Sequence, residues 1–266
     1  MKIRYASKTD QGVTRDHNED FFLNHERFGL FMVADGMGGY QGGDVASRLA
    51  LNSIVSYFET CAQKKGTFSE RAFHHAVDFS NRSVFNYKKK HAEIKEMGTT
   101  FVAFVPSCSK NGGGGMAFNI GDSRLYRFRD GKMTQITKDH SAEQEALPEF
   151  MQNMNQGKFS SILSRAMGIQ AQVAADPYDL ECKKNDLLLL CSDGLHSMIQ
   201  DDAISNILAK NQTLSEKCAA LVDAANQAGG QDNVTVTLIG IENADDPATL
   251  EILADVSRNT GDAPQA

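Results

Sequence analysis

Four aspartates stand at the ends of short apolar runs, where they could together hold a metal ion: Asp35, Asp122, Asp193 and Asp232. The run 28–34 is too short for a buried helix and is typical of a strand buried on both faces. Carboxylates that lie close together repel one another unless a cation holds them. Oxygen ligands suit Mg²⁺ or Mn²⁺ rather than zinc. Because a single Asp-Gly pair is also a common turn, the metal prediction depends on several of these acids meeting.

The glycines after Asp35 raise the alternative of a nucleotide site, since a helical pattern follows them. The dinucleotide fingerprint fails, because position 41 is a glutamine where a third glycine is needed. The glycine run 112–115 is not followed by the Lys-Ser or Lys-Thr of a P-loop. Nucleophilic catalysis is also unsupported, because the sequence has no Gly-x-Ser-x-Gly motif and no cysteine with an arginine six residues on. We therefore interpret these glycines as allowing close backbone approach.

The composition is that of a soluble globular protein, with 41% hydrophobic and 23% charged residues. The net charge of −7 argues against nucleic acid as a partner. The cysteines are five in number and form no C-x-x-C pair, which favours a reducing compartment. The N-terminus lacks the apolar core of a signal peptide, and no apolar run approaches the roughly 20 residues that span a bilayer. We expect a cytoplasmic protein without a membrane partner.

Hydrophobic periodicity predicts one α+β domain. Two helices are expected from apolar residues at one-face spacing, which are residues 51, 54, 55 and 58 and residues 73, 76, 77, 80, 84 and 87. Strand-like runs follow, with Asp130-Gly131 as a two-residue hairpin turn, so we expect an antiparallel sheet. Later helices are predicted around 200–210 and 214–227. Without a linker or repeat, residues 1–242 form one domain, and the acidic segment 243–266 is a partly disordered tail, frayed beyond about Arg258.

Eight short motifs, in order from about residue 5 to 240, resemble those of metal-dependent protein serine/threonine phosphatases, the protein phosphatase 2C family, in its compact bacterial form. The motifs are Gly12-x-x-Arg15-x-x-Asn18-Glu19-Asp20, Ala34-Asp35-Gly36-Met37-Gly38-Gly39, Met97-Gly98-Thr99-Thr100, Gly121-Asp122-Ser123-Arg124, Thr137-x-Asp139-His140-Ser141, Arg165-Ala166-Met167-Gly168, Cys191-Ser192-Asp193-Gly194-Leu195 and Gly230-x-Asp232-Asn233-Val234-Thr235. Each motif is short, but eight in this order are hard to obtain by chance.

The resemblance implies a four-layer αββα sandwich, in which two antiparallel sheets pack face to face with helices outside. It also implies two Mg²⁺ or Mn²⁺ ions in a cleft at one edge, with a third ion in bacterial members. The metal ligands that it implies are Asp35 bridging both ions, Asp193 and Asp232 on the first, the Gly36 carbonyl on the second, Glu19 and Asp20 largely through water, and Asp122 with Asp193 on the third.

Other residues of the motifs have implied supporting roles. Arg15 is expected to bind the substrate phosphate, because its planar guanidinium matches phosphate oxygens. Asn233 neighbours the metal cluster, and Thr99 and Thr100 pack or hydrogen-bond beneath it. A simpler interpretation of Arg15 is an ion pair with Glu19 or Asp20.

Three further residues of the motifs are expected to be structural. Arg124 and Asp139 resemble scaffold residues, and His140 is expected to form structural hydrogen bonds rather than act as a base.

The activity implied by the resemblance is hydrolysis of phosphoserine and phosphothreonine in proteins, opposing a Ser/Thr kinase. The implied mechanism is direct attack on phosphorus by a hydroxide shared between the two cations, with Asp35 and Arg15 as catalytic residues. Mammalian relatives carry a histidine where this chain has Met37, and methionine cannot donate a proton, so the general acid is unassigned. Residues 141–160 stand where the family has a variable flap beside the cleft. We expect a monomer whose partners are phosphorylated proteins.

Two alternatives remain open at this point. The chain could be a catalytically silent phosphatase-like module with a regulatory or scaffolding role, although acids at every ligand position argue against it. It could also be a regulator of the kind found in sporulation or stress responses, with the same chemistry directed at one small partner protein.

Overall fold

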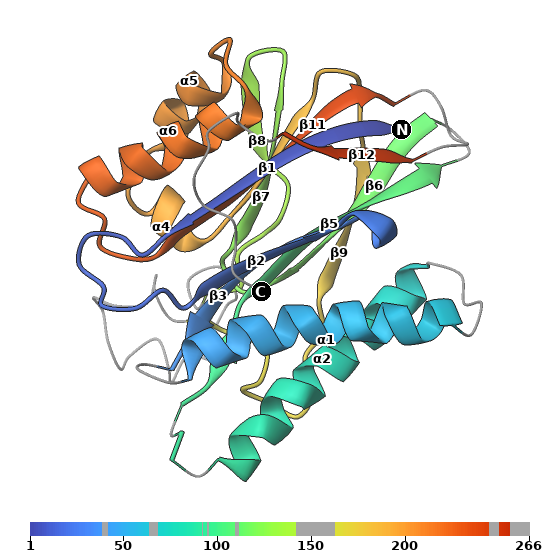
Figure 1. Cartoon of the computed structure of the whole chain (residues 1–266), viewed down its shortest axis with the longest axis vertical. Helices are drawn as coiled ribbons and strands as arrows, with labels where there is room; N and C mark the ends of the chain where they lie inside the picture. The colour runs from blue at the N-terminus through green and yellow to red at the C-terminus, as the bar shows by residue number, and fades with distance from the viewer. Residues whose placement is uncertain are drawn as a thin grey trace, which may run out of the picture.

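The computed structural model describes residues 1–38, 42–63, 69–91, 93–94, 96–109, 112–141, 163–244 and 250–255. Their strands form two sheets that face one another (Figure 1). The first sheet has the order β12 (Glu251–Ala254), β1 (Lys2–Asp10), β11 (Val234–Asn243), β10 (Leu187–Cys191), β7 (Arg124–Arg129) and β8 (Lys132–Gln135). The second has the order β2 (Asp20–His25), β3 (Leu30–Met37), β5 (Phe101–Ser109), β6 (Gly112–Ile120) and β9 (Asp176–Glu181), and β4 (Gly98–Thr99) pairs with the end of β3.

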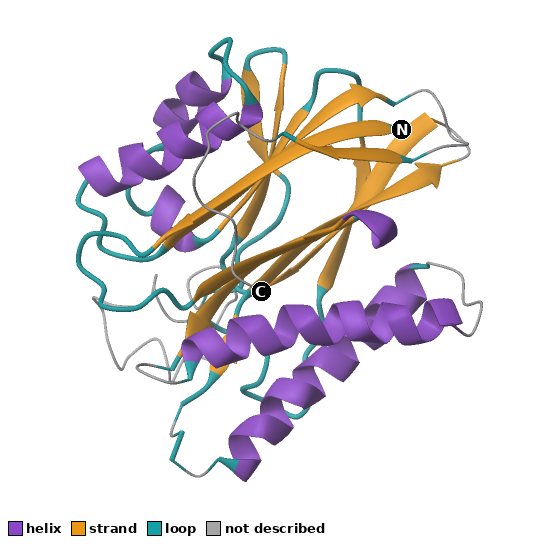
Figure 2. Cartoon of the chain, viewed as in Figure 1, coloured by secondary structure: helices purple, strands orange, loops and turns teal. Residues whose placement is uncertain are grey.

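Helices cover the outer faces of both sheets, which completes four layers (Figure 2). The second sheet is covered by α1 (Gly43–Gln63) and α2 (Glu70–Lys90). The first sheet is covered by α4 (Asp193–His196), α5 (Asp201–Leu208) and α6 (Leu214–Gln227). The αββα sandwich expected from the resemblance is therefore confirmed. None of the helices in the described ranges has the length and apolar character needed to cross a membrane.

The apolar runs that end near the aspartates are buried on both faces, as predicted. In β3, Leu30, Met32 and Ala34 pack under α1 and α2, whereas Phe31 and Val33 point toward the other sheet. The strand β10 alternates in the same way between the helix layer and the space between the sheets. Because successive side chains of a strand point to opposite faces, a strand in an inner layer must be apolar throughout.

Local signals explain where several elements begin and end. The N-cap Ser69 accepts a hydrogen bond from the backbone of Ala72 at the start of α2. The helix α6 begins with a capping box between Thr213 and Glu216. In the hairpin between β7 and β8, Asp130 and Gly131 both have positive φ angles, of 51° and 77°. These angles are typical of the predicted two-residue turn.

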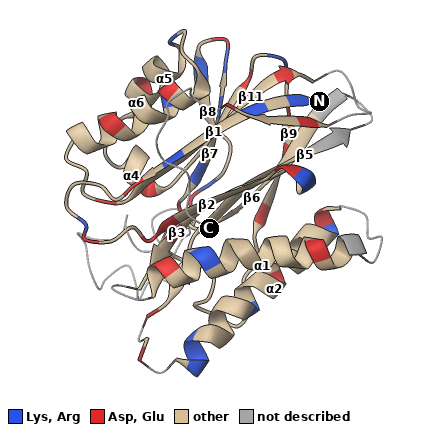
Figure 3. Cartoon of the chain, viewed as in Figure 1, with Lys and Arg blue, Asp and Glu red and all other residues tan. Residues whose placement is uncertain are grey.

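One pairing differs from the expected antiparallel arrangement. The short strand β12 runs parallel to β1 at the edge of the first sheet, because it runs opposite to β11, which is itself antiparallel to β1. Five residues of the segment expected to be a tail, Asn243 at the end of β11 and the four of β12, thus belong to the sheet. The part beyond Arg258 that we expect to fray lies outside the described residues, as does nearly all of the flap segment 141–160. Basic and acidic residues are interspersed along the ribbon (Figure 3).

Candidate functional site

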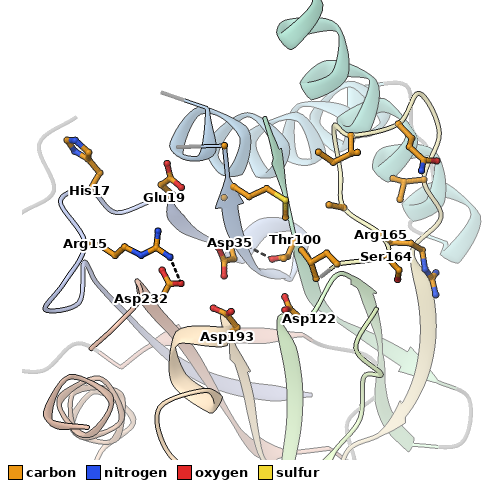
Figure 4. A pocket seen from close by; sticks show the side chains of 18 of the residues that line it. Arg15, His17, Glu19, Asp35, Thr100, Asp122, Ser164, Arg165, Asp193 and Asp232 are labelled. Carbon is orange, nitrogen blue, oxygen red and sulfur yellow. Dashed lines mark hydrogen bonds and ion pairs between the residues drawn. The ribbon is translucent and has the colours of Figure 1, made fainter. Parts of the chain in front are cut away.

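The strand ends bring the predicted acids to one cleft with a volume of about 810 Å³. Figure 4 shows Asp35, Asp122, Asp193 and Asp232 grouped at its centre, between Arg15 on one side and Arg165 on the other. Asp35 lies near the end of β3, Asp193 opens the short helix α4 after β10, and Asp232 precedes β11. The sequence did not predict α4, because a four-residue helix has no periodicity to detect. Residues from both sheets therefore build the floor of the cleft.

Two threonines hold the backbone of Asp35 in place. The backbone amide of Asp35 donates to Thr100 Oγ1 at 2.9 Å, and its carbonyl accepts from Thr100 N at 2.8 Å and from Thr99 Oγ1 at 2.9 Å. Thr100 Oγ1 also hydrogen-bonds Ser123 Oγ at 2.7 Å. Thr99 thus lies beneath the cleft, where it was expected, and Thr100 has the larger share of the contacts.

Asp20 and Glu19 lie at different depths. Asp20 is 3% exposed and does not line the cleft; its Oδ2 accepts from Ser192 Oγ at 2.7 Å, and its Oδ1 has no hydrogen-bond partner. Glu19 lines the cleft, close to the glycines that follow Asp35. A Cβ atom added to Gly43 would lie 2.5 Å from the Glu19 carboxyl carbon, so a side chain at position 43 would displace the Glu19 carboxylate from its present place.

Asn233 fastens the loop that carries Arg15 and Glu19. Its Oδ1 accepts from the backbone of Glu19, and its Nδ2 donates to the carbonyls of Gln11 and His17, each at 2.8 Å. All three contacts fall on the segment 11–19, so one buried amide fixes the curvature of that loop. Asn233 therefore neighbours the acids as a residue that positions a loop.

Arg15 forms an ion pair with Asp232, through Nη2 and Oδ2 at 2.7 Å. The simpler interpretation of Arg15 named Glu19 or Asp20 as partner, whereas the structure pairs it with an acid 217 residues away along the chain. Burial of Asp20 behind Ser192 explains why that acid is out of reach. The Arg15 and Asp232 side chains keep 50% and 32% of their surface exposed, so incoming groups can contact both.

Burial and mutual repulsion both act on the acids of the cleft. The pKa of Asp122 is raised to about 7, mainly by burial and then by the neighbouring Asp193 carboxylate. The pKa values of Asp35 and Asp193 are also raised, mainly by burial and then by neighbouring carboxylates. The pKa of Glu19 is raised by burial, and the Arg15 charge partly opposes that shift. In the absence of cations, holding all of these groups ionised therefore costs free energy.

The donor set fits hard divalent cations. One carboxylate oxygen each of Asp20 and Asp193 is buried without a hydrogen-bond partner, which is costly unless another positive group satisfies it. Every donor in this group is an oxygen, as Mg²⁺ and Mn²⁺ prefer. Within the described ranges, no three His, Cys, Asp or Glu side chains are already arranged as a metal cluster.

The residues expected to be structural lie behind the acids. Arg124 binds Asp139 through three hydrogen bonds of 2.6–3.1 Å. His140 exchanges contacts with Gly121 next to Asp122, since its backbone amide donates to the Gly121 carbonyl at 2.9 Å and its Nδ1 accepts from the Gly121 amide at 3.1 Å. His140 thereby supports the loop that carries Asp122.

The sequence did not identify one side of the cleft. Residues 163–174, after the expected flap, line the side opposite Arg15 and are mostly uncharged. Their only early signal was the motif ending at Gly168. Met37 also lines the cleft, where it offers no exchangeable proton.

Comparison with known proteins agrees with this arrangement. The family model described as protein phosphatase 2C matches residues 12–238. The serine/threonine phosphatase stp of Listeria innocua is 36% identical over 240 residues, which cover 87% of this chain and 93% of that protein. The structure of the Mycobacterium tuberculosis serine/threonine phosphatase PstP/Ppp superposes with a TM-score of 0.76 at 30% identity, covering 91% of this chain and 99% of that one. A structure of the PstP catalytic domain in complex with two manganese ions gives a TM-score of 0.73 at 29% identity, covering 92% and 99%.

Proposed function

This chain belongs to the protein phosphatase 2C family and is a serine/threonine phosphatase; we propose that it hydrolyses phosphoserine and phosphothreonine of proteins in the cleft at the strand ends. The observation that carries the proposal is the meeting of four aspartates, from four separate segments, beside one exposed arginine. Such a set can bind divalent cations and a phosphate dianion side by side. The relatives with this sequence pattern bear the same activity in their names.

The metal sites are proposed as follows. Asp35, Asp193 and Asp232 would hold two Mg²⁺ or Mn²⁺ ions, with Asp35 contributing to both and the Gly36 carbonyl contributing to the second. Glu19 and Asp20 would act through water, and Asp122 with Asp193 would hold a third ion. The oxygen-only donors and the unpartnered oxygens of Asp20 and Asp193 support this proposal, as do the two manganese ions in the PstP structure. Bound divalent cations supply an activated water near neutral pH and offset phosphoryl charge.

The side chains of this chain then have defined tasks. Arg15 leaves Asp232 and binds the phosphoryl oxygens, for which its fork of N–H donors is suited. Asp232 would thereby become free to act as a metal ligand. Thr99 and Thr100 keep the Asp35 backbone fixed, and the loop clamped by Asn233 keeps Arg15 within reach. Positioning of this kind is the main contribution of a protein to phosphoryl transfer. Residue 37, being methionine, takes no part in protonating the leaving group.

We also propose that the enzyme is a cytoplasmic monomer that opposes a Ser/Thr kinase. The cysteines whose side chains are described, Cys61, Cys182, Cys191 and Cys218, are all free thiols, which suits a reducing compartment. The kinase is inferred from the reaction, because phosphoserine and phosphothreonine substrates must be produced by one.

Turnover of p-nitrophenyl phosphate and of a phosphothreonine peptide tests the proposal. We expect hydrolysis with Mn²⁺, none with excess EDTA, and loss of turnover in Asp193→Ala. Absence of turnover with every divalent ion would instead support the catalytically silent module. Phosphoproteomics of a deletion strain would distinguish a broad phosphatase from one directed at a single partner.

A further inference from the structure

The cleft has one charged side and one uncharged side. The charged side includes Arg15, Asp16, His17 and Glu19. Across the acids, most of the residues on the opposite side are uncharged, among them Leu163, Ile169, Gln170, Gln172, Val173 and Ala174. Arg165 belongs to that side as well, but Asp176 binds its Nη1 at 2.7 Å and offsets its charge. A substrate segment lying across the cleft therefore meets two chemically different surfaces.

Among the large apolar side chains of the uncharged side, Ile169 is the most exposed. It keeps 45% of its surface in contact with solvent, although most large hydrophobic residues of the described chain are buried. Val173, on the same side, is partly buried against the core beneath α2. Single exposed hydrophobic residues are ordinary on protein surfaces, but this one stands in the wall of the cleft where substrate must bind.

The loop that carries Ile169 is held as firmly as the loop that carries Arg15. Asn81 of α2 is 1% exposed; its Oδ1 accepts from the backbone of Gly168 at 2.7 Å, and its Nδ2 donates to the carbonyl of Gln170 at 3.0 Å. Ile169 lies between these two contacts. Asn233 clamps the charged side in the same manner, so each side of the cleft is fixed by one buried asparagine amide.

The position of Ile169 is tied to the acids through β4. A Cβ atom added to Gly98 would lie 2.7 Å from Ile169 Cδ1, so the isoleucine side chain lies against the backbone of β4. The neighbouring Thr99 exchanges two backbone hydrogen bonds with Met167, at 3.0 and 2.8 Å, and contacts the Asp35 carbonyl. This isoleucine is therefore a fixed part of the cleft wall.

We propose that Ile169 and Val173 form a specificity surface that receives an apolar side chain next to the phosphorylated serine or threonine of a protein substrate. The inference depends on the proposed function and names the substrate class of the same cleft. An apolar neighbour buries surface against Ile169, whereas an aspartate there would lose hydration without gaining a cation. The side-chain amides of Gln170 and Gln172 stand beside the surface, where they can hydrogen-bond the peptide backbone. A hydrophobic contact of this size gives a preference of about tenfold.

Matched phosphothreonine peptides test the inference with Mn²⁺-loaded enzyme. The peptides are identical except for leucine, serine, aspartate or lysine on one or the other side of the phosphothreonine, and phosphate release gives kcat/KM. We expect the wild-type enzyme to prefer the best leucine peptide over its serine counterpart by about tenfold. Ile169→Ser should reduce that ratio to below twofold, and Ile169→Glu should shift the preference toward lysine.

Phe79→Ser is the matched control, because Phe79 is 47% exposed on α2 and does not line the cleft. This control should keep the wild-type ratio. Equal kcat/KM for all peptides in the wild type, or a ratio unchanged in Ile169→Ser, would overturn the specificity surface while leaving the phosphatase proposal intact. Absence of phosphate release from every peptide would overturn the proposed function itself.

Discussion

Two arginine–aspartate pairs differ in their burial and in their number of hydrogen bonds. One pair is Arg15–Asp232 in the cleft, and the other is Arg124–Asp139 behind it. Arg15 contacts Asp232 through a single hydrogen bond of 2.7 Å, and both side chains remain well exposed. Arg124 contacts Asp139 through three hydrogen bonds, and the two side chains are only 21% and 7% exposed. Tyr126 provides a further acceptor, at 2.7 Å from Arg124 Nη1.

The Arg15–Asp232 ion pair can therefore separate when a ligand binds, whereas the Arg124–Asp139 ion pair stays formed. An exposed pair with one contact is worth about 0–1 kcal/mol, so phosphate and a metal ion can replace it at little cost. Removing one partner of a buried pair costs roughly 3–5 kcal/mol, because the remaining charge is left uncompensated. The structure thus places a replaceable ion pair among the acids and a permanent one at the base of β7.

The largest expected effect comes from removing an acid of the cleft. Asp193→Asn should lower kcat/KM by roughly 10³-fold, because metal-assisted charge stabilisation is worth several kcal/mol and each 1.36 kcal/mol is tenfold in rate. The fold should persist, since one buried oxygen of Asp193 has no partner to lose.

Thermal unfolding gives a second readout of the same variant. Mn²⁺ at about 100 times its Kd should stabilise the wild-type protein by about 2.7 kcal/mol, and Asp193→Asn should abolish most of this shift. Asn24→Ala is a suitable control, because its side chain donates to Ser7 and does not line the cleft. An undiminished Mn²⁺ shift in Asp193→Asn would contradict the proposed ligand role.

The next prediction tests the permanent pair. Asp139→Ala should lower the free energy of unfolding by about 3 kcal/mol, since Arg124 keeps some solvent contact and the cost falls at the lower end for a buried pair. In the same EDTA-containing buffer, Asp232→Ala should change stability by less than about 1 kcal/mol. Denaturant melts of both variants measure the difference. Equal losses in the two variants would remove the distinction between the pairs.

A smaller effect is expected when Arg15 is replaced by lysine. Lysine keeps the charge but lacks the planar fork of N–H donors, so one hydrogen bond to the phosphate is lost. A hydrogen bond to a charged group is worth about 1.5–3 kcal/mol. The kcat/KM for a phosphopeptide should therefore fall by about tenfold, mainly through a higher KM. Stability should be unaffected. Arg124→Lys should have the opposite result: the free energy of unfolding falls, and the activity per folded molecule stays the same. An Arg15→Lys enzyme with wild-type KM would show that Arg15 does not bind the phosphate.

Patterns of local chemistry predicted much of the fold. The apolar runs beside Asp35 and Asp193 predicted buried strands, because only an inner strand is apolar on both faces. The periodic stripe of α6 predicted 214–227, which are the bounds observed. One cleft contains Asp35, Asp193 and Asp232, because the strand ends that carry them lie at a shared edge. The family resemblance predicted this grouping.

Other features depend on contacts between distant segments, which a single sequence does not encode in any local pattern. Asp20 is buried beside Asp35 rather than in the wall of the cleft, where Ser192, 172 residues later, donates to its carboxylate. The partner of Arg15 is decided by the relative depths of Asp20 and Asp232 rather than by spacing along the chain. The position of Ile169 depends on Asn81, which binds the backbone on both sides of it. In the sequence, Asn81 is not distinguished from the other polar residues of α2. The ligand roles themselves stay predictions until a metal is observed.

The smallest expected effect concerns Tyr126, the third member of the permanent pair. Tyr126→Phe removes the acceptor of Arg124 Nη1 but leaves all three contacts with Asp139 in place. One lost hydrogen bond should cost about 1 kcal/mol, measurable as a shift of the denaturant midpoint without a change of slope. The activity per folded molecule should equal that of the wild type, because Tyr126 packs against the helix layer of the first sheet and does not line the cleft. A fall in kcat at unchanged stability would mean that the Arg124 network transmits its geometry to Asp122, and the two pairs would then belong to one site.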